Sequence, residues 1–172
     1  MYRIPIYKIS LVRDGSHQSD IRTIKQPSDV TELAKSYLQG VDREHFIILM
    51  LDTKNKLIGI NTVSIGSLNS AIVHPREDFK PAILANANSI ILAHNHPSGN
   101  PKPSLEDIKI TERLIEGGKI LGMEILDHII IGEEGYNGYY SMKEHANIIL
   151  VCIFYRWQDN KQSASHKGYK LK

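Results

Sequence analysis

Short apolar runs bounded by turn-forming residues recur along the chain and predict a series of β-strands. The runs are shorter than an ordinary helix, and many are rich in β-branched residues, which favour extended backbone. The predicted strands cover residues 7–13, 45–51, 57–65, about 71–73, 89–94 and about 124–131. The polar segment Asp52–Lys56 between the second and third of these predicts a hairpin turn.

Helices are expected between these strands. One is expected to begin at Asp29 and to stop at Gly40, and another to begin at Pro75, because a proline suits the first helical position. The apolar side of this second helix is expected to consist of Phe79, Ile83 and Leu84. A third helix is expected over about 105–116, with 117–118, two glycines, marking its frayed end. This order predicts a mixed α/β fold.

Composition places the chain among globular proteins. Its 172 residues suit one domain with a sizeable core, and 41% hydrophobic with 23% charged residues is ordinary for that class. The single Cys152 excludes an internal disulfide. The first residues lack the apolar core of a signal peptide, and the longest apolar run, 148–155, is too short to span a bilayer, so a cytoplasmic location without membrane partners is expected.

The charge is unevenly distributed. Residues 156–172 carry five basic residues and one acidic residue, a net charge of +4, whereas the whole chain carries +2. Residues 1–155 therefore carry −2. Proteins that bind nucleic acid attract its phosphates with a basic excess, so this charge gives no support to a nucleic-acid partner for the main part of the chain.

The most specific chemical pattern lies between residues 94 and 107. His94 and His96 end an apolar strand, and side chains two residues apart on a strand point the same way. The segment 97–103 contains three prolines and a glycine, so it forms a loop that can fold the next helix back onto the strand end. Asp107 then lies in the first turn of that helix. Two imidazoles and a carboxylate are suited to a catalytic zinc site, which leaves one position open.

Simpler explanations exist for each part of this pattern. Ser104-x-x-Asp107 is also a helix capping box, so both residues can have a purely structural role. A His-x-His pair by itself is more often an incidental surface pair than a pair of ligands. The combination of the two patterns around one loop favours the metal site.

The run His94–Pro103 with Ser104 and Asp107, continued by Leu126–Gly132, resembles the RadC family of the JAMM, or MPN-plus, metalloprotease-like superfamily. The resemblance covers roughly residues 5–145, in a short, single-domain form. It implies the cytidine-deaminase-like JAMM/MPN fold, a curved, mostly antiparallel or mixed sheet flanked by helices. Residues 1–145 would form the domain, and 146–172 would be an extension outside the family pattern.

The resemblance also implies roles for the site residues. His94, His96 and Asp107 would bind Zn²⁺, which lowers the pKa of a bound water to about 7. Glu44, at the position of the family's upstream glutamate, would move the proton, although its polar surroundings also fit an ordinary surface acid. Ser104 would stabilise the oxyanion of the tetrahedral intermediate. The implied activity is zinc-dependent hydrolysis of a peptide or isopeptide bond in an unidentified substrate.

Two other functions fit the resemblance. Relatives are often named as DNA-repair factors, but the charge opposes this, and about 40 residues before Glu44 leave no room for a helix-hairpin-helix module. A non-catalytic scaffold for protein contacts is the second alternative, although scaffolds of this kind usually lose the metal ligands, which are present here.

Three further expectations concern neighbouring residues. Asn95 should face away from the metal and tie down the loop through hydrogen bonds to backbone. One of Asp127 and His128 should point toward the core or the site, and a core or supporting histidine is favoured over a ligand. The apolar segment 146–155 is expected to add a strand or to mediate self-association, and 158–172 to be a flexible tail.

Overall fold

The computed structural model describes residues 3–66, 73–133 and 138–145. Within them the chain forms three helices and five strands that follow one another along the sequence. Their bounds are α1 (Pro27–Tyr37), β1 (His45–Leu51), β2 (Leu57–Ile65), α2 (Pro75–Leu84), β3 (Ser89–Asn95), α3 (Leu105–Leu121), β4 (Glu124–Ile131) and β5 (Tyr139–Ser141).

The five strands form one mixed sheet in the order β2-β1-β3-β4-β5. Neighbouring strands are antiparallel except β3 and β4, which are parallel. A parallel pair needs a crossover connection, and α3 provides it. The mostly antiparallel sheet with flanking helices agrees with the fold that the sequence predicts.

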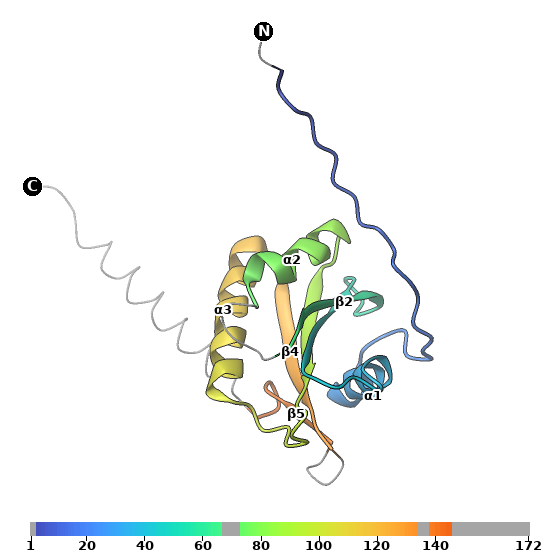
Figure 1. Ribbon diagram of the computed structural model, residues 1–172, viewed down its shortest axis with the longest axis vertical. Helices are drawn as coiled ribbons and strands as arrows, with labels where there is room; N and C mark the ends of the chain where they lie inside the picture. Colours follow the sequence, from blue (N-terminus) through green and yellow to red (C-terminus); the bar gives the residue numbers. More distant parts are fainter. Residues whose placement is uncertain (1–2, 67–72, 134–137, 146–172) are drawn as a thin grey trace, which may run out of the picture.

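Helices cover both faces of the sheet (Figure 1). Successive residues of a strand point to opposite faces, so β1 contributes to two separate cores. Ile47, Leu49 and Leu51 pack with α1, whereas Phe46, Ile48 and Met50 pack with α2 and α3. The sheet is thus enclosed between helices, and its central strands are apolar on both faces.

The predicted strands at 45–51, 57–65 and 124–131 have the bounds seen in the structure, and the predicted strand 89–94 continues to Asn95. The predicted strand at 7–13 is wrong. These residues have no regular structure, and Tyr7 and Val12 are 83% and 81% exposed. In Figure 1 the N-terminal segment runs away from the domain, so no strand among the described residues lies beside it, and an isolated segment does not form a strand by itself.

The predicted end of α3 is also wrong, because the helix continues through Gly117 and Gly118 to Leu121. These glycines allow close packing instead of fraying. A Cβ atom on Gly118 would clash with the carbonyl oxygen of Met123, and one on Gly117 would lie 3.1 Å from a ring carbon of Phe79 in α2. The helix stops at Gly122, whose φ of +68° is typical of a glycine C-cap.

Two smaller differences concern α1 and α2. Helix α1 begins at Pro27, two residues before the predicted start, and the Asp29 carboxylate accepts hydrogen bonds from the backbone of Lys25 and Gln26. Asp29 therefore caps the helix from its third position. In α2, Phe79 is buried as predicted, but Ile83 is 50% exposed and is not part of the core, because the helix turns this position outward.

Some expectations lie outside the described residues. These are most of the predicted strand at 71–73, the boundary of the domain near 145, and the apolar and basic parts of 146–172. Among the residues that are described, no helix combines the length and apolar character needed to cross a membrane.

Candidate metal centre

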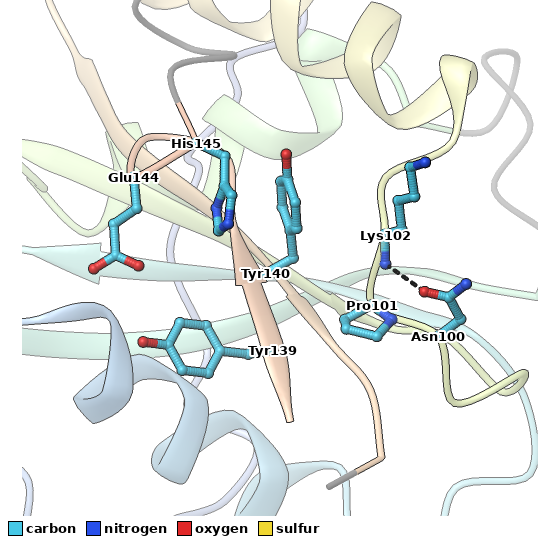
Figure 2. A pocket seen from close by; sticks show the side chains of 7 residues that line it. All are labelled: Asn100, Pro101, Lys102, Tyr139, Tyr140, Glu144 and His145. Carbon is cyan, nitrogen blue, oxygen red and sulfur yellow. Dashed lines mark hydrogen bonds between the residues drawn. The ribbon is translucent and has the colours of Figure 1, made fainter. Parts of the chain in front are cut away.

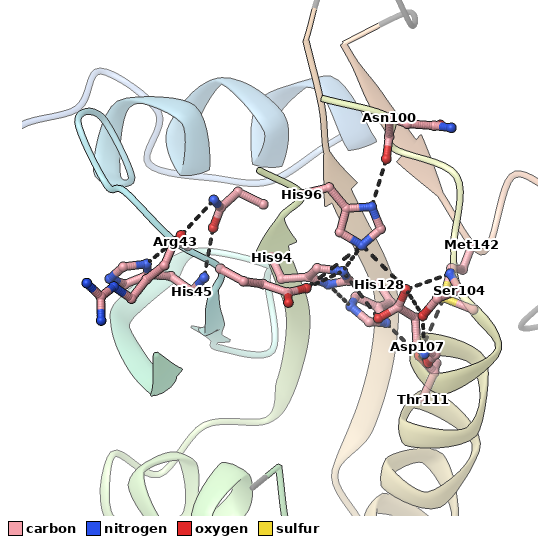
Figure 3. A network of polar contacts seen from close by, with 12 residues as sticks. Arg43, His45, His94, His96, Asn100, Ser104, Asp107, Thr111, His128 and Met142 are labelled. Atoms are coloured by element: carbon pink, nitrogen blue, oxygen red, sulfur yellow. Dashed lines mark hydrogen bonds and ion pairs between the residues drawn. The ribbon is translucent and has the colours of Figure 1, made fainter. Parts of the chain in front are cut away.

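Three segments of the chain bring four potential ligands together. His94 lies in β3 and His96 directly follows that strand, Asp107 lies in the first turn of α3, and Glu44 directly precedes β1. One nitrogen or oxygen of each lies within 4.8 Å of the others. Figure 3 shows the side chains of His94, His96 and Asp107 pointing toward one another. The cluster can hold a metal ion.

The loop after β3 is held against β4. The amide of His96 donates to the carbonyl of Ile131 at 2.9 Å, and the amide of Glu133 donates to the carbonyl of Gly99 at 2.8 Å. Gly99 has a φ of +78°, a conformation that favours glycine. These contacts turn the chain at His96 and direct it back toward the start of α3, which places Asp107 beside the histidines.

The distances within the cluster suit a tetrahedral ion. Zinc bonds of about 2 Å separate ligand atoms by roughly 3.3 Å in tetrahedral geometry. The Nε2 atoms of His94 and His96 are 2.9 Å apart, and Asp107 oxygens lie 3.4 and 3.5 Å from them. Glu44 Oε1 is more distant, at 3.7 and 3.9 Å from the two nitrogens. His94, His96 and Asp107 therefore form the tighter group, with Glu44 beside it.

The cluster is closed on one side and open on the other. The side chains of His94 and Asp107 are 0% and 2% exposed, whereas those of His96 and Glu44 are 15% and 17% exposed. Catalytic zinc sites have three protein ligands and one position for water or substrate. The partial exposure of His96 and Glu44 leaves a route to such a position.

Hydrogen bonds orient both imidazoles. His96 Nδ1 lies 2.7 Å from the carbonyl oxygen of Asn100. A carbonyl can only accept, so Nδ1 carries the proton, and in the neutral ring Nε2 presents its lone pair to the cluster. This arrangement, in which the outer nitrogen donates to a backbone carbonyl, is common for histidines that bind metals.

A longer series of hydrogen bonds orients His94. The Thr111 hydroxyl donates to the Asp107 carbonyl at 2.6 Å and lies 2.5 Å from Nδ1 of His128, whose Nε2 is 2.8 Å from Nδ1 of His94. Because Thr111 uses its proton on the carbonyl, His128 donates from Nδ1 and accepts at Nε2. His94 then donates from Nδ1, which leaves the lone pair of its Nε2 directed at the cluster.

The surroundings of the three histidines shift their pKa values in different directions. Burial and then the neighbouring His128 hold the pKa of His94 well below its usual value, and burial lowers the pKa of His128 to about 4. Although burial opposes it, hydrogen bonds to Asp107 and to the carbonyl of Asn100 raise the pKa of His96. Two lone pairs 2.9 Å apart repel, so a shared cation is needed between His94 and His96. A proton on His96 provides it without metal, and a metal ion fits the same place.

Asp107 combines both roles that its sequence pattern allows. Its backbone amide donates to Ser104 Oγ at 3.1 Å, and its Oδ2 accepts from the amide and hydroxyl of Ser104 at 2.7 and 2.6 Å. This is a complete capping box. Burial raises the pKa of the Asp107 carboxyl, but hydrogen bonding to His96, the charge of His94 and the Ser104 bonds together lower it. The carboxylate is therefore ionised, as a metal ligand must be.

Some of the residues that hold the histidines in place were predicted from the sequence, and others were not. His128 is buried and contacts His94, as expected for a supporting histidine, while Asp127 accepts from Ser141 and the amide of Lys143. Thr111 and the carbonyl of Asn100 were not identified from the sequence. Thr111 lies four residues after Asp107, on the same helix face, which is the one local signal that could have revealed it.

A cavity of about 550 Å³ lies beside the loop that carries His96. Figure 2 shows Tyr139, Tyr140 and His145 on one side and the Asn100–Lys102 segment on the other. The rings of Tyr140 and His145 stack with centroids 4.0 Å apart. Because the carbonyl of Asn100 accepts from His96, this cavity adjoins the cluster through one residue.

Comparisons with known proteins identify a family of related chains. The family model described as a RadC-like JAB domain matches residues 24–147. Similar curated proteins include UPF0758 proteins of Desulfitobacterium hafniense (strain DSM 10664 / DCB-2), 55% identical over 121 residues, and of Rubrobacter xylanophilus, 53% identical over 122 residues. The UPF0758 protein of Alkaliphilus metalliredigens is 55% identical over 137 residues.

These matches cover 70%, 71% and 80% of this chain and 52%, 52% and 56% of the relatives, in the same order. The chain thus spans about half the length of the curated relatives that it matches. The matched region includes every element of the described domain and all four residues of the cluster. The chain belongs to the RadC-like JAB domain family.

Proposed function

We propose that this protein is a zinc-dependent hydrolase that cleaves an amide bond in a peptide or isopeptide substrate. The observation that supports this most is the convergence of His94, His96, Asp107 and Glu44 around one point that is buried on one side and accessible on the other. Zinc is favoured over calcium or magnesium because two of the three closest ligands are imidazole nitrogens.

Bound zinc would supply an activated water and polarise the substrate carbonyl. The chain's residues provide the rest. His94, His96 and Asp107 would hold the ion, each oriented by a hydrogen bond to His128, to the carbonyl of Asn100 or to Ser104. Glu44, near the ion without belonging to the tight ligand group, would accept a proton from water and deliver it to the leaving amine.

Ser104 has a more constrained role. Its hydroxyl proton is directed to Asp107 Oδ2 at 2.6 Å, and its oxygen accepts from the Asp107 amide. To stabilise an oxyanion, the hydroxyl would need to rotate away from Asp107 once the metal takes up part of that carboxylate's charge. We infer that Ser104 contributes first through the position of Asp107 and second through the oxyanion.

Zinc content tests the metal assignment. Protein purified without chelator should contain one zinc per chain by elemental analysis, and a His94→Ala/His96→Ala double variant should contain none. His17→Ala is a suitable control, because His17 contacts Ser36 outside the cluster. Equal zinc in the parent and the double variant would disprove the assignment, and so would a parent that takes up no zinc when it is supplied.

Hydrolysis is tested separately with Glu44→Gln, which removes a proton carrier but no ligand of the tight group. Internally quenched peptides and a lysine isopeptide serve as probes, and cellular proteins retained by the zinc-loaded Glu44→Gln variant identify the natural substrate by mass spectrometry. The variant should keep its zinc and lose cleavage. If it cleaved a substrate as fast as the parent, Glu44 would not be the proton carrier.

A further inference from the structure

Asn95, which lies between the two histidines, contacts the backbone on both sides of Glu44. Its Oδ1 accepts from the amide of His45 at 2.8 Å, and its Nδ2 donates to the carbonyl of Arg43 at 3.0 Å. The sequence predicted that Asn95 would face away from the metal and tie down its loop through hydrogen bonds to backbone, and the hydrogen bonds to backbone are confirmed. Its partners, however, lie about fifty residues away and not in its own loop.

The sheet register explains this contact. Strands β1 and β3 pair antiparallel, and the last pair at this end is Phe46 with His94. The next pair would be His45 with Asn95, but beyond it the chain turns toward β4, where the amide of His96 donates to Ile131. The side-chain amide of Asn95 thus takes the place of the backbone hydrogen bonds that the turn removes. It holds the ends of β1 and β3 together.

Glu44 needs such support because it lies at the end of a loop. The preceding residues include Gly40, with a φ of +80°, and the exposed pair Asp42 and Arg43. On the far side, the amide of Gly66 donates to the carbonyl of Glu44 at 2.8 Å. The backbone of three consecutive residues, 43 to 45, is thereby held by hydrogen bonds, two of which involve the side chain of Asn95.

We propose that Asn95 is a positioning residue that fixes the backbone around Glu44 and so sets the distance of its carboxylate from the metal ligands. This inference rests on the proposed role of Glu44. One asparagine would then link the two parts of the chemistry, because the same segment carries His94 and His96 as ligands and holds the proton carrier in place. The primary amide provides an acceptor and a donor on two separate atoms, which match the amide of His45 and the carbonyl of Arg43.

Amide hydrogen exchange tests the contact without metal or substrate. In Asn95→Ala the His45 amide should exchange about tenfold faster than in the parent, relative to the amides of Ile47 and Ile48 in the interior of β1. In Asn95→Asp the acceptor for His45 remains, so His45 should stay protected, while an oxygen now faces the carbonyl of Arg43. Unchanged exchange of His45 in Asn95→Ala would overturn the proposal.

Kinetics and zinc content test the consequence. Asn95→Ala should keep one zinc per chain, lower kcat by about 10- to 100-fold and change KM little. Combined with Glu44→Gln, it should add no further loss, because the group that it positions is already absent. A full kcat in Asn95→Ala, or additive losses in the double variant, would overturn the positioning role.

Asp52→Ala is a matched control at the opposite end of β1. Asp52 Oδ1 accepts from the amides of Lys54 and Lys56 at 2.8 and 2.9 Å, so this variant also loses two side-chain bonds to backbone. Asp52→Ala should leave kcat and the exchange rate of the His45 amide unchanged. A decrease in kcat equal to that of Asn95→Ala would overturn a specific role for Asn95. If the parent cleaves no substrate, the proposed function fails, and the exchange result still decides the contact.

Discussion

Nδ1 of His94 lies 2.8 Å from Nε2 of His128, and both rings are fully buried. The two residues belong to the parallel pair β3 and β4, where His128 is the partner of Leu92, one strand period before His94. The contact gives the Nδ1–H of His94, the fully buried histidine of the cluster, an acceptor in Nε2 of His128. It assigns the His94 nitrogen that is available to a metal, a choice that the His-x-His pattern leaves open.

Loss of this acceptor should weaken metal binding. His128→Leu leaves the Nδ1–H of His94 buried without its partner, so zinc affinity should fall by about 10- to 100-fold. Competition with a chromophoric chelator measures this affinity. Thr111→Val, which removes the hydroxyl one step further away, should show a smaller loss in the same direction. Parent-like affinity in a folded His128→Leu protein would contradict the proposed support of His94.

The capping box predicts a stability effect at Ser104. Ser104→Ala loses the acceptor for the Asp107 amide and the donor to the Asp107 carboxylate, and should lower the free energy of unfolding by about 1 kcal/mol. Urea denaturation measures this change. Ser104→Thr retains the hydroxyl and should be near the parent. Zinc should still bind to Ser104→Ala, and a variant without zinc would mean that Ser104 is essential to the position of Asp107.

Asp78 predicts an unusual dependence of stability on pH. It is fully buried in α2, and within the part of the chain that the structure describes neither carboxylate oxygen has a hydrogen-bond partner. Burial raises its pKa from 3.8 to about 7. The folded state therefore holds a proton that the unfolded state releases, so stability is lost as pH rises from about 4 to about 7.

Asp78→Asn should remove this dependence. At about pH 8 the variant should be more stable than the parent by up to about 4 kcal/mol, and near pH 4 the two should be similar. Thermal unfolding followed by circular dichroism across this pH range measures the difference. Glu77→Gln, a neighbouring exposed acid paired with Lys80, is the control and should change little. A parent whose stability rises over the same interval, with no difference from Asp78→Asn, would contradict the prediction.

Gly118 predicts a packing effect that opposes helix propensity. Alanine normally favours a helix over glycine by about 1 kcal/mol, but here the added Cβ would clash with the carbonyl of Met123. Gly118→Ala should therefore destabilise the protein by about 1 to 3 kcal/mol in chemical denaturation. Gly117→Ala should cost less, since its nearest neighbours are side chains of Phe79 and Pro75 that can shift. A stabilised Gly118→Ala protein would show that Met123 moves away at little cost.

Much of the candidate metal site was predictable, because most of its residues lie close to one another in the sequence. Residues two apart on a strand share a face, so His94 and His96 had to point together once β3 was recognised. Ser104 and Asp107 followed from a helix N-terminus after a proline-rich loop. Local patterns of this kind depend on backbone geometry within a few residues, so the sequence alone is enough to predict them. The same holds for the bounds of most strands.

Glu44 marks the limit of that approach. Nothing near it distinguishes it from a surface acid, and it was identified only through resemblance to a family. The structure places it 3.7 Å from His94 because β1 and β3 are neighbours in the sheet. Likewise, the exposed segment at 7–13 has an apolar strand pattern, but none of the strands that the structure describes lies beside it, and its own residues do not reveal this.

The tertiary structure alone decided the partners of Asn95, the orientation of His94 by His128 and Thr111, and the continuation of α3 through Gly118. The contacts of Asn95 with His45 and of His94 with His128 join elements that are not adjacent along the chain, and the strand order β2-β1-β3-β4-β5 sets them. The sequence by itself determined which residues can bind a metal. The packing of α3 and of the sheet around β3 decided which nitrogen of each histidine faces the cluster and what holds Glu44 beside it, because these depend on distances that spacing along the chain does not define.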